Sequence, residues 1–565
     1  DAVAYGSAAP PVAGWSGAPV PALRPGEVVR RAPLAAEDTD TSSDWTHFRE
    51  YRYGYSDRGV VSSSVPAGRL TCFASPDCSL EVVAGVVSAA GASIRLCSYE
   101  LSSPTVCSLL SRACSRGVDV HVLVDSQPVG GMSAAQVACL SALVDSGADV
   151  RVLGGNMDEG QVRHIGALHA KYIVADRATL VVLSENFVED GVPTDRLFGN
   201  RGWGVSVDDP VSASWMSEVF DDDSRIGRSC VWRWSDDSRY LQGAGIPEPP
   251  VSAHPEGMLG PAVTTKAAEV SLFLSPDSSV GGPFLAPLVS GAEKVLFEQF
   301  QADLEWTTRW ADGPVTSPVV QSVEDVVGAG GEVRGLFDGL WYNAGPNTDV
   351  VDHLTAALPY GSASSFRLLA EESPVTVLHN KGLVLDGSAV VSSNNWVYAS
   401  FSRNRELAVV VGSDEASGYF SEAFELDWVP DQVAPVADAG PDLDLPAGSP
   451  AVLDASGSWD DRAVANMSWY LDGDGSADAW GAEADVGVLA PGVHRFTLEV
   501  TDAWGNSATD SVEVTVGTPA PVRDPPLLAP ADAMWPLPAA VSLIVVALAV
   551  ARKLNLLRAS TRGEG

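Results

Sequence analysis

The sequence predicts an α/β fold class: two homologous α-β-α sandwich units with pseudo-twofold symmetry, followed by an antiparallel β-sandwich and one transmembrane helix. Strand and helix signals alternate from about residue 69, and the same order starts again near residue 263, which is typical of α/β units. From residue 433, short alternating strands are separated by Gly and Asp turns, as in a β-sandwich. An uncharged apolar run near the C-terminus has the length of a short membrane span.

Changes of composition along the chain predict seven segments. They are an extended N-terminal segment (1–66), repeat 1 (67–250), repeat 2 (251–431), the β-sandwich (433–517), a Pro-rich linker (518–533), the transmembrane helix (534–552) and a cytoplasmic tail (553–565).

The second α/β unit repeats landmarks of the first. CFASPDCSL at 72–80 returns as SLFLSPDSS at 271–279, and RGVDVHVLVD at 116–125 returns as GGEVRGLFDG at 330–339. Two units of about 180 residues indicate a duplication, because solenoids repeat at shorter periods.

Each unit carries one copy of the pattern H-x-K-x4-D, with His169 and Lys171 in the first copy and His379 and Lys381 in the second. The flanking residues are apolar and β-branched, so both copies are predicted strands, on which residues two apart project from the same face. The chain has only five lysines and eight histidines. Random placement would give about 0.07 H-x-K pairs, so two copies are far above chance.

A Ser/Asn pair follows each copy on the next predicted strand: Ser184 and Asn186, then Ser393 and Asn395. A chain reversal at Asp176 and at Asp386 would lay each pair beside its His/Lys pair. The second copy is one residue shorter between the Asp and the Ser/Asn pair. A slip inside a strand would turn Asn395 to the wrong face, so the missing residue must come from the turn.

Two His/Lys/Asn sets in homologous halves predict one shared site. One imidazole can attack as a nucleophile while the other donates a proton to the leaving group. Two ammonium groups and two amides can hold an oxyanion that is charged throughout the reaction. This chemistry suits a phosphodiester substrate and needs no metal ion or other cofactor, and we predict none.

Residues 69–430 resemble the phospholipase D superfamily, through the duplicated HKD motif and the SPD, Y-x-L and RGV landmarks. The resemblance implies a covalent phosphohistidine intermediate that is released to water or to an alcohol. It implies His169 as the nucleophile and His379 as the general acid. Phosphate-binding roles fall to Lys171, Lys381, Asn186 and Asn395, supporting roles to Ser184 and Ser393, and structural roles to Asp176 and Asp386.

One departure from the family concerns an acidic residue that hydrogen-bonds the histidine and lies downstream of each motif. The second copy has it at Glu406, whereas the first has Gly202 at that place. A carboxylate at the second ring nitrogen orients an imidazole. We therefore expect His169 to lack its partner unless Asp195 or Glu185 substitutes; the roles of the two histidines could then be exchanged, or turnover reduced.

The segment 434–516 resembles immunoglobulin-like modules of the polycystic-kidney-disease type, through WYLDGDG at 469–475 and the run from Val488 to Asn506. In such proteins the module is usually a spacer or an adhesion unit. A role in spacing the α/β units from the C-terminal segment is therefore implied.

The C-terminal segment and the cysteines predict a cell-surface protein. Met534–Ala551 carries no charge and is followed by Arg552 and Lys553, as expected at the cytoplasmic end of a span. We expect a single-pass cell-membrane protein with its catalytic region outside. In that compartment the seven cysteines could form up to three disulfides, with Cys72–Cys78 the favoured local pair.

The net charge of −38 argues against a dedicated nucleic-acid binder, because no basic stripe is visible in the sequence. The favoured function is an extracellular membrane-anchored phosphodiesterase that cleaves or exchanges phospholipid head groups. A metal-independent extracellular nuclease of the same chemistry is the first alternative. A catalytically weakened surface binding protein is the second, motivated by Gly202 and by Leu183 and Ser392, which stand where the family has Gly.

Overall fold

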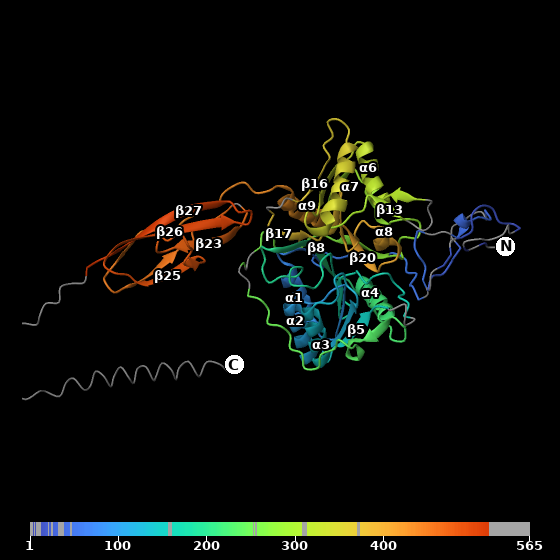
Figure 1. The fold of residues 1–565 in the computed structure, drawn as a ribbon, viewed down its shortest axis with the longest axis horizontal. Helices are drawn as coiled ribbons and strands as arrows, with labels where there is room; N and C mark the ends of the chain where they lie inside the picture. Colours follow the sequence, from blue (N-terminus) through green and yellow to red (C-terminus); the bar gives the residue numbers. More distant parts are fainter. Residues whose placement is uncertain are drawn as a thin grey trace, which may run out of the picture.

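A computed structural model describes residues 4–518, apart from residues 5, 7–12, 21, 24–25, 32–38, 46–47, 53, 156–160, 252–253, 255–256, 308–312, 370–372 and 461. The two α/β units lie against each other, and the β-sandwich extends to one side of them (Figure 1).

The first unit alternates strands and helices as predicted. Its elements are β2 (Leu70–Ser75), α1 (Ser79–Ala89), β3 (Ser93–Ser98), α2 (Pro104–Ser115), β4 (Asp119–Asp125), α3 (Ala134–Asp145), β5 (Asp149–Leu153), β6 (Tyr172–Ala175), β7 (Thr179–Leu183), β8 (Gly199–Asp208), α4 (Pro210–Asp223), β9 (Val231–Arg233) and the 3-10 helix η3 (Trp234–Asp236). The strands form one sheet in the order β10-β2-β8-β7-β6-β3-β4-β5-β9.

The second unit repeats this plan. Its elements are β11 (Ala268–Ser275), α5 (Leu285–Ser290), β12 (Lys294–Gln299), β13 (Glu305–Thr307), β14 (Pro314–Thr316), α6 (Pro318–Gly328), β15 (Glu332–Phe337), η4 (Trp341–Asn343), α7 (Ala344–Ala356), β16 (Ser365–Leu368), β17 (Val375–Leu378), β18 (Lys381–Leu385), β19 (Ser388–Ser392), α8 (Tyr398–Ser402), β20 (Glu406–Gly412) and α9 (Asp414–Trp428). The sheet order β1-β11-β20-β19-β18-β12-β15-β16 matches the first eight strands of the order in the first unit, and β9 has no counterpart among the described residues.

The repeated helix starts have the same local cause. Ser103 accepts a hydrogen bond from the backbone NH of Val106 and is followed by the Pro that begins α2. Ser317 accepts from the backbone NH of Val320 and is followed by the Pro that begins α6. A serine cap with proline at the first helical position satisfies one free NH and fixes φ, so both units start this helix at equivalent positions.

Short edge strands link each sheet to a segment from outside its own α/β unit. The strand β1 (Val61–Val65), within the segment we expected to be extended, pairs antiparallel with β11 of the second unit. The strand β10 (Ala262–Val263) precedes the second unit but pairs with β2 of the first. Each sheet is therefore closed at one edge by a segment from outside its own repeat.

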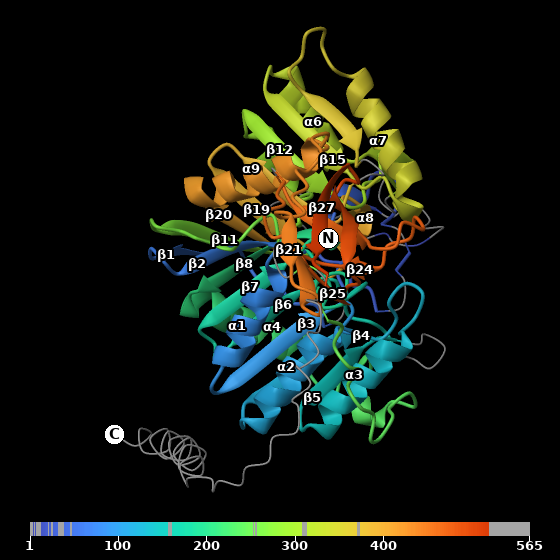
Figure 2. The ribbon, with the colours of Figure 1, turned by 90° about the vertical axis from the view of Figure 1, so that its left-hand side faces the viewer.

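The two sheets face each other across a central hydrophobic core, which also contains side chains of α4 and α9. The helices α1–α3 cover the outer face of the first sheet, and α5–α7 cover that of the second. Figure 2 shows this order of layers, with the outer helices of the two units at opposite ends. The pseudo-twofold arrangement places equivalent edges of the two sheets at one interface.

Two buried arginines cross that interface. Arg201 on β8 contacts Asp427 of the second unit (Nε–Oδ2, 2.6 Å) and Asp77 of its own unit (2.6 Å). Arg405, directly before β20, mirrors it, with Asp223 of the first unit at 2.7 Å (Nε–Oδ2). Both guanidinium groups are bidentate to the carboxylate from the other unit. Such pairs have strict geometry, so they fix how the two units lie together.

The β-sandwich follows at β21 (Leu443–Leu445), β22 (Pro450–Asp454), β23 (Val464–Tyr470), β24 (Ala479–Trp480), β25 (Glu483–Val488), β26 (Gly492–Asp502) and β27 (Ser507–Val516). The strands β21-β27-β26-β23-β24 form one sheet, and β22-β25 form the other. Trp469 is fully buried between them and donates from Nε1 to the carbonyl of Gly481 (3.1 Å).

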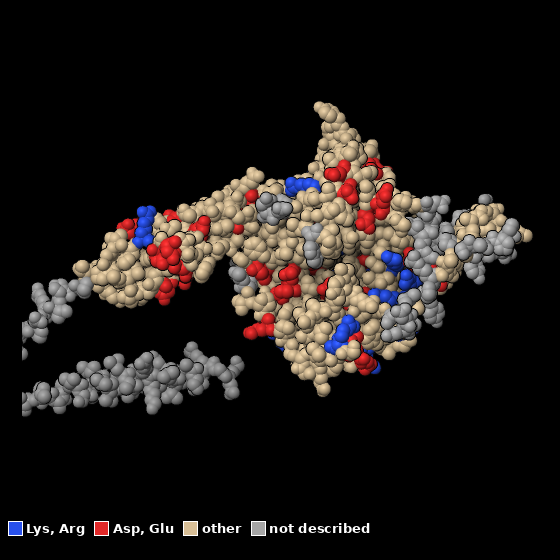
Figure 3. Space-filling model, viewed as in Figure 1, with Lys and Arg blue, Asp and Glu red and all other residues tan. Residues whose placement is uncertain are grey.

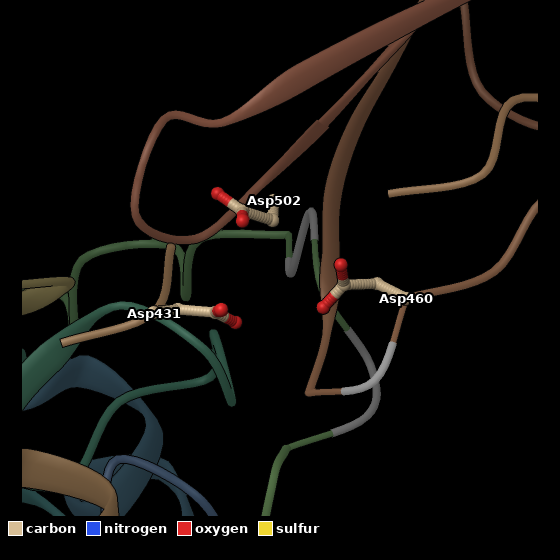
Figure 4. Close-up of side chains that lie close together, drawn as sticks. All are labelled: Asp431, Asp460 and Asp502. Atoms are coloured by element: carbon tan, nitrogen blue, oxygen red, sulfur yellow. The ribbon is translucent and has the colours of Figure 1, made fainter. Parts of the chain in front are cut away.

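A cluster of carboxylates lies where α9 leads into the sandwich. Oxygens of Asp431, Asp460 and Asp502 come within 4.8 Å of one another (Figure 4), the one group in the described chain close enough to share a metal ion. Arg462 Nε lies 3.6 Å from Asp431, Asp460 accepts from the backbone NH of Arg462, and Asp502 accepts from that of Asn506. Asn506 Nδ2 also donates to the Asp431 carbonyl (3.2 Å). These contacts explain the cluster as the junction between the domains.

The expected disulfides are wrong, since all seven thiols are free. Cys72 belongs to the central core, whereas Cys78 belongs to the outer core of the first unit. The two residues of the favoured pair thus face different cores, and buried cysteines here pack as small apolar side chains.

No helix of the described residues is long and apolar enough to cross a membrane. The expected transmembrane helix (534–552) and tail (553–565), and residues 519–533 of the linker, lie outside the described part of the chain.

We predict that Arg405→Met lowers the free energy of unfolding by about 3–5 kcal/mol, because it leaves the carboxylate of Asp223 buried without its partner. Urea denaturation followed by tryptophan fluorescence measures this. Arg225→Met is the control, since the Arg225–Asp222 pair is exposed and should cost below about 0.5 kcal/mol. Equal effects of the two substitutions would contradict the stabilising role of the buried Arg405–Asp223 pair at the interface.

Candidate active site

The two motif copies form equivalent hairpins, as predicted. The strand β6 pairs antiparallel with β7, and β18 with β19. The turn takes residues 176–178 in the first hairpin and only 386–387 in the second, so the missing residue does come from the turn. The Asp176 carboxylate accepts from the backbone NH groups of residues 91, 92 and 93, and Asp386 accepts from those of 293 and 294. Both motif aspartates therefore anchor the turns and take no part in the site.

The residue before each histidine is held by the other unit. Leu168 forms a parallel bridge with Arg405, and Leu378 pairs with Arg201. The His169 backbone NH also donates to the Arg405 carbonyl (2.8 Å). The backbone segments that carry the histidines thus reach across the interface, beside the arginines that clamp it.

His169 is oriented by the second unit. Its Nδ1 lies 2.8 Å from Glu406 Oε2 and 3.2 Å from the carbonyl of Ser393. The Ser393 hydroxyl donates to the same Glu406 oxygen (2.6 Å), which fixes the carboxylate. We expected Glu406 to serve His379 of its own copy and His169 to lack a partner, and both expectations are wrong. They fail because each histidine crosses to the other sheet.

His379 is oriented by the first unit. Its Nδ1 lies 3.3 Å from Glu185 Oε1, and it also contacts the backbone of Ser184. Glu185 Oε2 accepts from Asn200 Nδ2 (3.2 Å). Neither Glu185 Oε1 nor His379 Nδ1 makes a hydrogen bond among the described residues, so Glu185 is the acid that lies beside His379 and is not a partner of His169. Asp195 does not substitute, since its carboxylate pairs with His254.

Both histidines line one cavity of about 1050 Å³ together with Asn186, Asn395 and Glu406. One polar atom of each asparagine carboxamide, labelled Oδ1, is buried without a hydrogen-bond partner among the described residues. These two amides are therefore free to bind a ligand in the cavity, as the resemblance implies. Ser184 and Ser393 are fully buried and hold neighbouring groups instead, since Ser184 Oγ accepts from the Trp203 backbone NH (3.1 Å).

The two lysines lie beneath the cavity. Lys171 Nζ donates to the His169 carbonyl (2.6 Å), and Lys381 Nζ donates to that of His379. Burial lowers the pKa of Lys171 to about 8, although the negative charges of Glu406 and Glu185 raise it in part. Burial, with the charge of Lys171, also holds the pKa of Lys381 well below its usual value. A bound anion would restore both charges, so the pair favours a negatively charged substrate.

The same burial keeps the histidines neutral. Burial lowers the pKa of His169, the charge of Glu406 opposes this, and Lys171 adds to it. Burial and both lysines hold the pKa of His379 well below its usual value. With Nδ1 of His169 held by Glu406, its Nε2 presents a lone pair to the cavity, which is what a nucleophile requires.

Two aromatic residues complete the site and were not predicted to belong to it. The Tyr99 ring packs edge-on against His169, with centroids 5.3 Å apart, and the Phe300 ring packs against His379 at 4.5 Å. Lys381 Nζ lies 4.6 Å from the Phe300 ring centre. The repeated runs IRLCSYEL and VLFEQFQ place Tyr99 and Phe300 at equivalent positions, which could have identified them.

Comparisons with known proteins agree with this geometry. The family profile described as "Cardiolipin synthase, PLD-like domain" matches residues 85–224 and 314–428, and a PKD domain profile matches residues 432–516. No curated protein matches the chain significantly.

Solved structures also match the chain. Phosphatidylserine synthase of Haemophilus influenzae Rd KW20 is 12% identical over 65% of this chain and 87% of its own, with a TM-score of 0.46. Nuc of Salmonella typhimurium, a phospholipase D family member, is 21% identical over 31% of this chain and 99% of its own, with a TM-score of 0.23. NucT of Helicobacter pylori is 15% identical over 29% and 94%, also with a TM-score of 0.23. These TM-scores are below 0.5, so the classification rests on the family match and the site.

The profile match in both repeats, and one cavity shared by two HKD histidines, support a phospholipase D-like domain, a class whose members are phosphodiesterases or phosphatidyltransferases. The chain contains a phospholipase D-like domain of the cardiolipin synthase type, followed by a PKD domain.

The pKa shifts predict a bell-shaped pH profile of kcat/KM. The nucleophile must be neutral, and the pKa of His169 lies below 6.5, so the acid limb should fall below pH 6.5. Lys171 loses its charge as the pH rises through about 8, so the alkaline limb should fall near pH 8. Rates measured from pH 5 to 10 check this. Lys294→Met, at an exposed lysine, should leave both limbs in place. A profile that stays flat to pH 10 would contradict the role of Lys171.

Proposed function

We propose that this protein is a membrane-anchored phosphodiesterase that hydrolyses phospholipid head groups or exchanges them for another alcohol. The observation that carries the proposal is the shared cavity, in which each HKD histidine contacts a carboxylate of the other unit. Anchoring and an extracellular catalytic region rest on the sequence of residues 534–553, an apolar run followed by basic residues.

The site supports a two-step transfer. His169 Nε2 attacks phosphorus and forms the P–N bond as the P–O bond to the leaving group breaks. The neutral His379 gives the proton on its Nε2 to the leaving oxygen and takes one at Nδ1 from the protonated carboxyl of Glu185. Water or an alcohol then attacks phosphorus, His379 takes its proton, and the P–N bond breaks to free His169. Lys171, Lys381, Asn186 and Asn395 hold the phosphoryl oxygens through both steps.

The charge around the cavity favours a phospholipid over a nucleic acid. The described residues that line the cavity include Glu100, Asp190 and Glu406 but no Arg or Lys. On the face shown in Figure 3, acidic side chains are spread over the domains, and basic ones lie at a few separate points. A polynucleotide would need a row of cations for its successive phosphates. A phospholipid brings a single phosphodiester, which the two buried lysines can neutralise.

Substrate class is tested with the purified protein in EDTA, incubated with vesicles of labelled phosphatidylcholine and phosphatidylethanolamine and, separately, with labelled single-stranded DNA. We expect head-group release from vesicles and no cleavage of DNA. The His169→Asn variant is the control for contaminating activity. Cleavage of DNA alone would show the nuclease, and cleavage of neither would favour a binding protein.

The roles of the histidines can be separated with a 4-nitrophenyl phosphodiester, whose leaving group needs no proton. We expect His379→Ala to form the phosphohistidine in a single turnover and to accumulate it, because only the second step then needs a base. His169→Ala should form none. Alkaline quenching, which preserves phosphohistidine, and mass spectrometry measure the adduct. An adduct on His379 in the His169→Ala variant would reverse the assignment.

A further inference from the structure

Gly202 occupies the place of Glu406 in the first unit. Gly202 on β8 pairs with Ser75 on β2, and Glu406 on β20 pairs with Ser275 on β11. Both follow the clamping arginine directly. The equivalence is therefore set by strand register, and the first unit has no side chain where the second has its carboxylate.

The space at Gly202 is taken by Glu185. A Cβ built on Gly202 would lie 2.5 Å from both Cγ and Oε1 of Glu185 and 2.8 Å from the Ser184 hydroxyl oxygen. These distances are too short for any side chain to coexist with Glu185 as it lies. Glycine at 202 is thus a requirement for the position of Glu185, and backbone conformation does not demand it, since its φ is not in the left-handed region.

The environment of Glu185 repeats that of Glu406. Asn200 Nδ2 lies 3.2 Å from Glu185 Oε2, and Asn404 Nδ2 lies 3.4 Å from Glu406 Oε1. Asn200 and Asn404 each precede their clamping arginine by one residue, so they are equivalent. The same amide therefore holds a carboxylate in both units, although the carboxylate comes from different strands.

The residue equivalent to Glu185 in the second unit does something else. Asn394 lies between Ser393 and Asn395, as Glu185 lies between Ser184 and Asn186. Its carboxamide is bonded to Ser392, Ser275 and Ser400 and does not reach a histidine. The contact between Glu185 and His379 is therefore a property of the first unit alone.

We propose that Glu185 is the positioning carboxylate of His379, moved from residue 202 to residue 185, and that Gly202 is its necessary companion. The proposal rests on the phosphodiesterase function of the same site. Glu185 touches no reacting atom; it acts through His379, whose ring it orients.

The moved carboxylate is held less firmly than Glu406. Its Oε1 lies 3.3 Å from the His379 Nδ1 without the geometry of a hydrogen bond, whereas Glu406 Oε2 and His169 Nδ1 are hydrogen-bonded at 2.8 Å. Both serine hydroxyl oxygens accept from an equivalent backbone NH, that of Leu407 for Ser393 and that of Trp203 for Ser184. The Ser393 hydroxyl also donates to Glu406, whereas no hydrogen bond from the Ser184 hydroxyl to Glu185 occurs among the described residues. Burial raises the pKa of Glu185 to about 8. The positive charges of Lys381 and Lys171 lower this pKa, and the negative charge of Asp190 raises it further. Below that pH the carboxyl can give its proton to His379 Nδ1 as Nε2 releases one to the leaving oxygen, and can take it back in the second step.

The test exchanges the two arrangements. Glu185→Asn introduces the residue that the second unit has at the equivalent position, Asn394, and leaves His379 without a carboxylate. The double variant Glu185→Asn, Gly202→Glu also introduces the equivalent of Glu406, so the first unit then has both residues of the second. We expect the single variant to lower kcat on phospholipid vesicles by about 10- to 100-fold and the double variant to recover most of that loss. With the 4-nitrophenyl diester, whose leaving group needs no proton, phosphohistidine formation should change by less than about threefold in either variant.

Glu189→Gln is the matched control, since Glu189 is a nearby acid whose hydrogen bonds go to Thr194. It should leave kcat unchanged, and thermal melting of every variant reports loss of folding. A single variant as active as the wild type, or a folded double variant that recovers nothing, would overturn the proposal.

A second readout does not need turnover. Nitrogen-15 NMR of the histidine side chains should show a changed tautomer and pKa for His379 in Glu185→Asn, and a wild-type signal for His169. Recovery of the His379 signal in the double variant supports the positioning role even if no phosphodiester is cleaved, in which case only the proposed function fails. An unchanged His379 signal in Glu185→Asn overturns the positioning role whatever the activity.

Discussion

Two buried arginines determine both the interface and the catalytic site. Arg201 and Arg405 each bind an aspartate of the opposite unit, in pairs with almost no exposed surface. Their backbones pair with the residues that precede His379 and His169. The residue after each arginine is the position of the histidine's carboxylate in the family. One short stretch, within β8 in the first unit and at the start of β20 in the second, therefore holds the units together and sets the imidazole in place. A shift at the interface would therefore move both histidines.

The charge of the cavity follows from the same burial. Two ammonium groups lie beneath the histidines, and burial disfavours the charged forms of both lysines and of Glu185. A bound phosphodiester adds the negative charge that such a site lacks, so the lysines regain their full charge when substrate is present. A chain with only five lysines has placed two of them here, although its net charge is −38. Electrostatic attraction is thus concentrated at the phosphoryl group and is not spread over the surface.

Much of this arrangement could be predicted from local sequence. The one-residue difference between the copies correctly placed the shorter turn at Asp386. The predicted strand at His169 and Lys171 is wrong in its start, since β6 begins at Tyr172, and His169 lines the cavity whereas Lys171 does not. The partners of the histidines could not be predicted. The order of strands along the chain indicates which strands are neighbours within one sheet, but it does not indicate that the segment before each histidine pairs with the sheet of the other unit. Glu406 was therefore assigned to the wrong histidine. The Cys72–Cys78 pair failed for a related reason: only five residues lie between them in the sequence, but their side chains belong to cores on opposite faces of the sheet.

A duplicated site begins with two equivalent histidines, whereas a phosphohistidine mechanism needs two different ones. The nucleophile needs a firmly held ring with a free lone pair, and Glu406 with its serine provides this for His169. The acid must give up a proton in one step and recover it in the next, so a looser and more easily protonated partner suits it. Glu185 has these properties at His379, and the loss of the side chain at residue 202 is what admits it. The departure from internal symmetry thus falls at the point where the chemistry requires the two halves to differ.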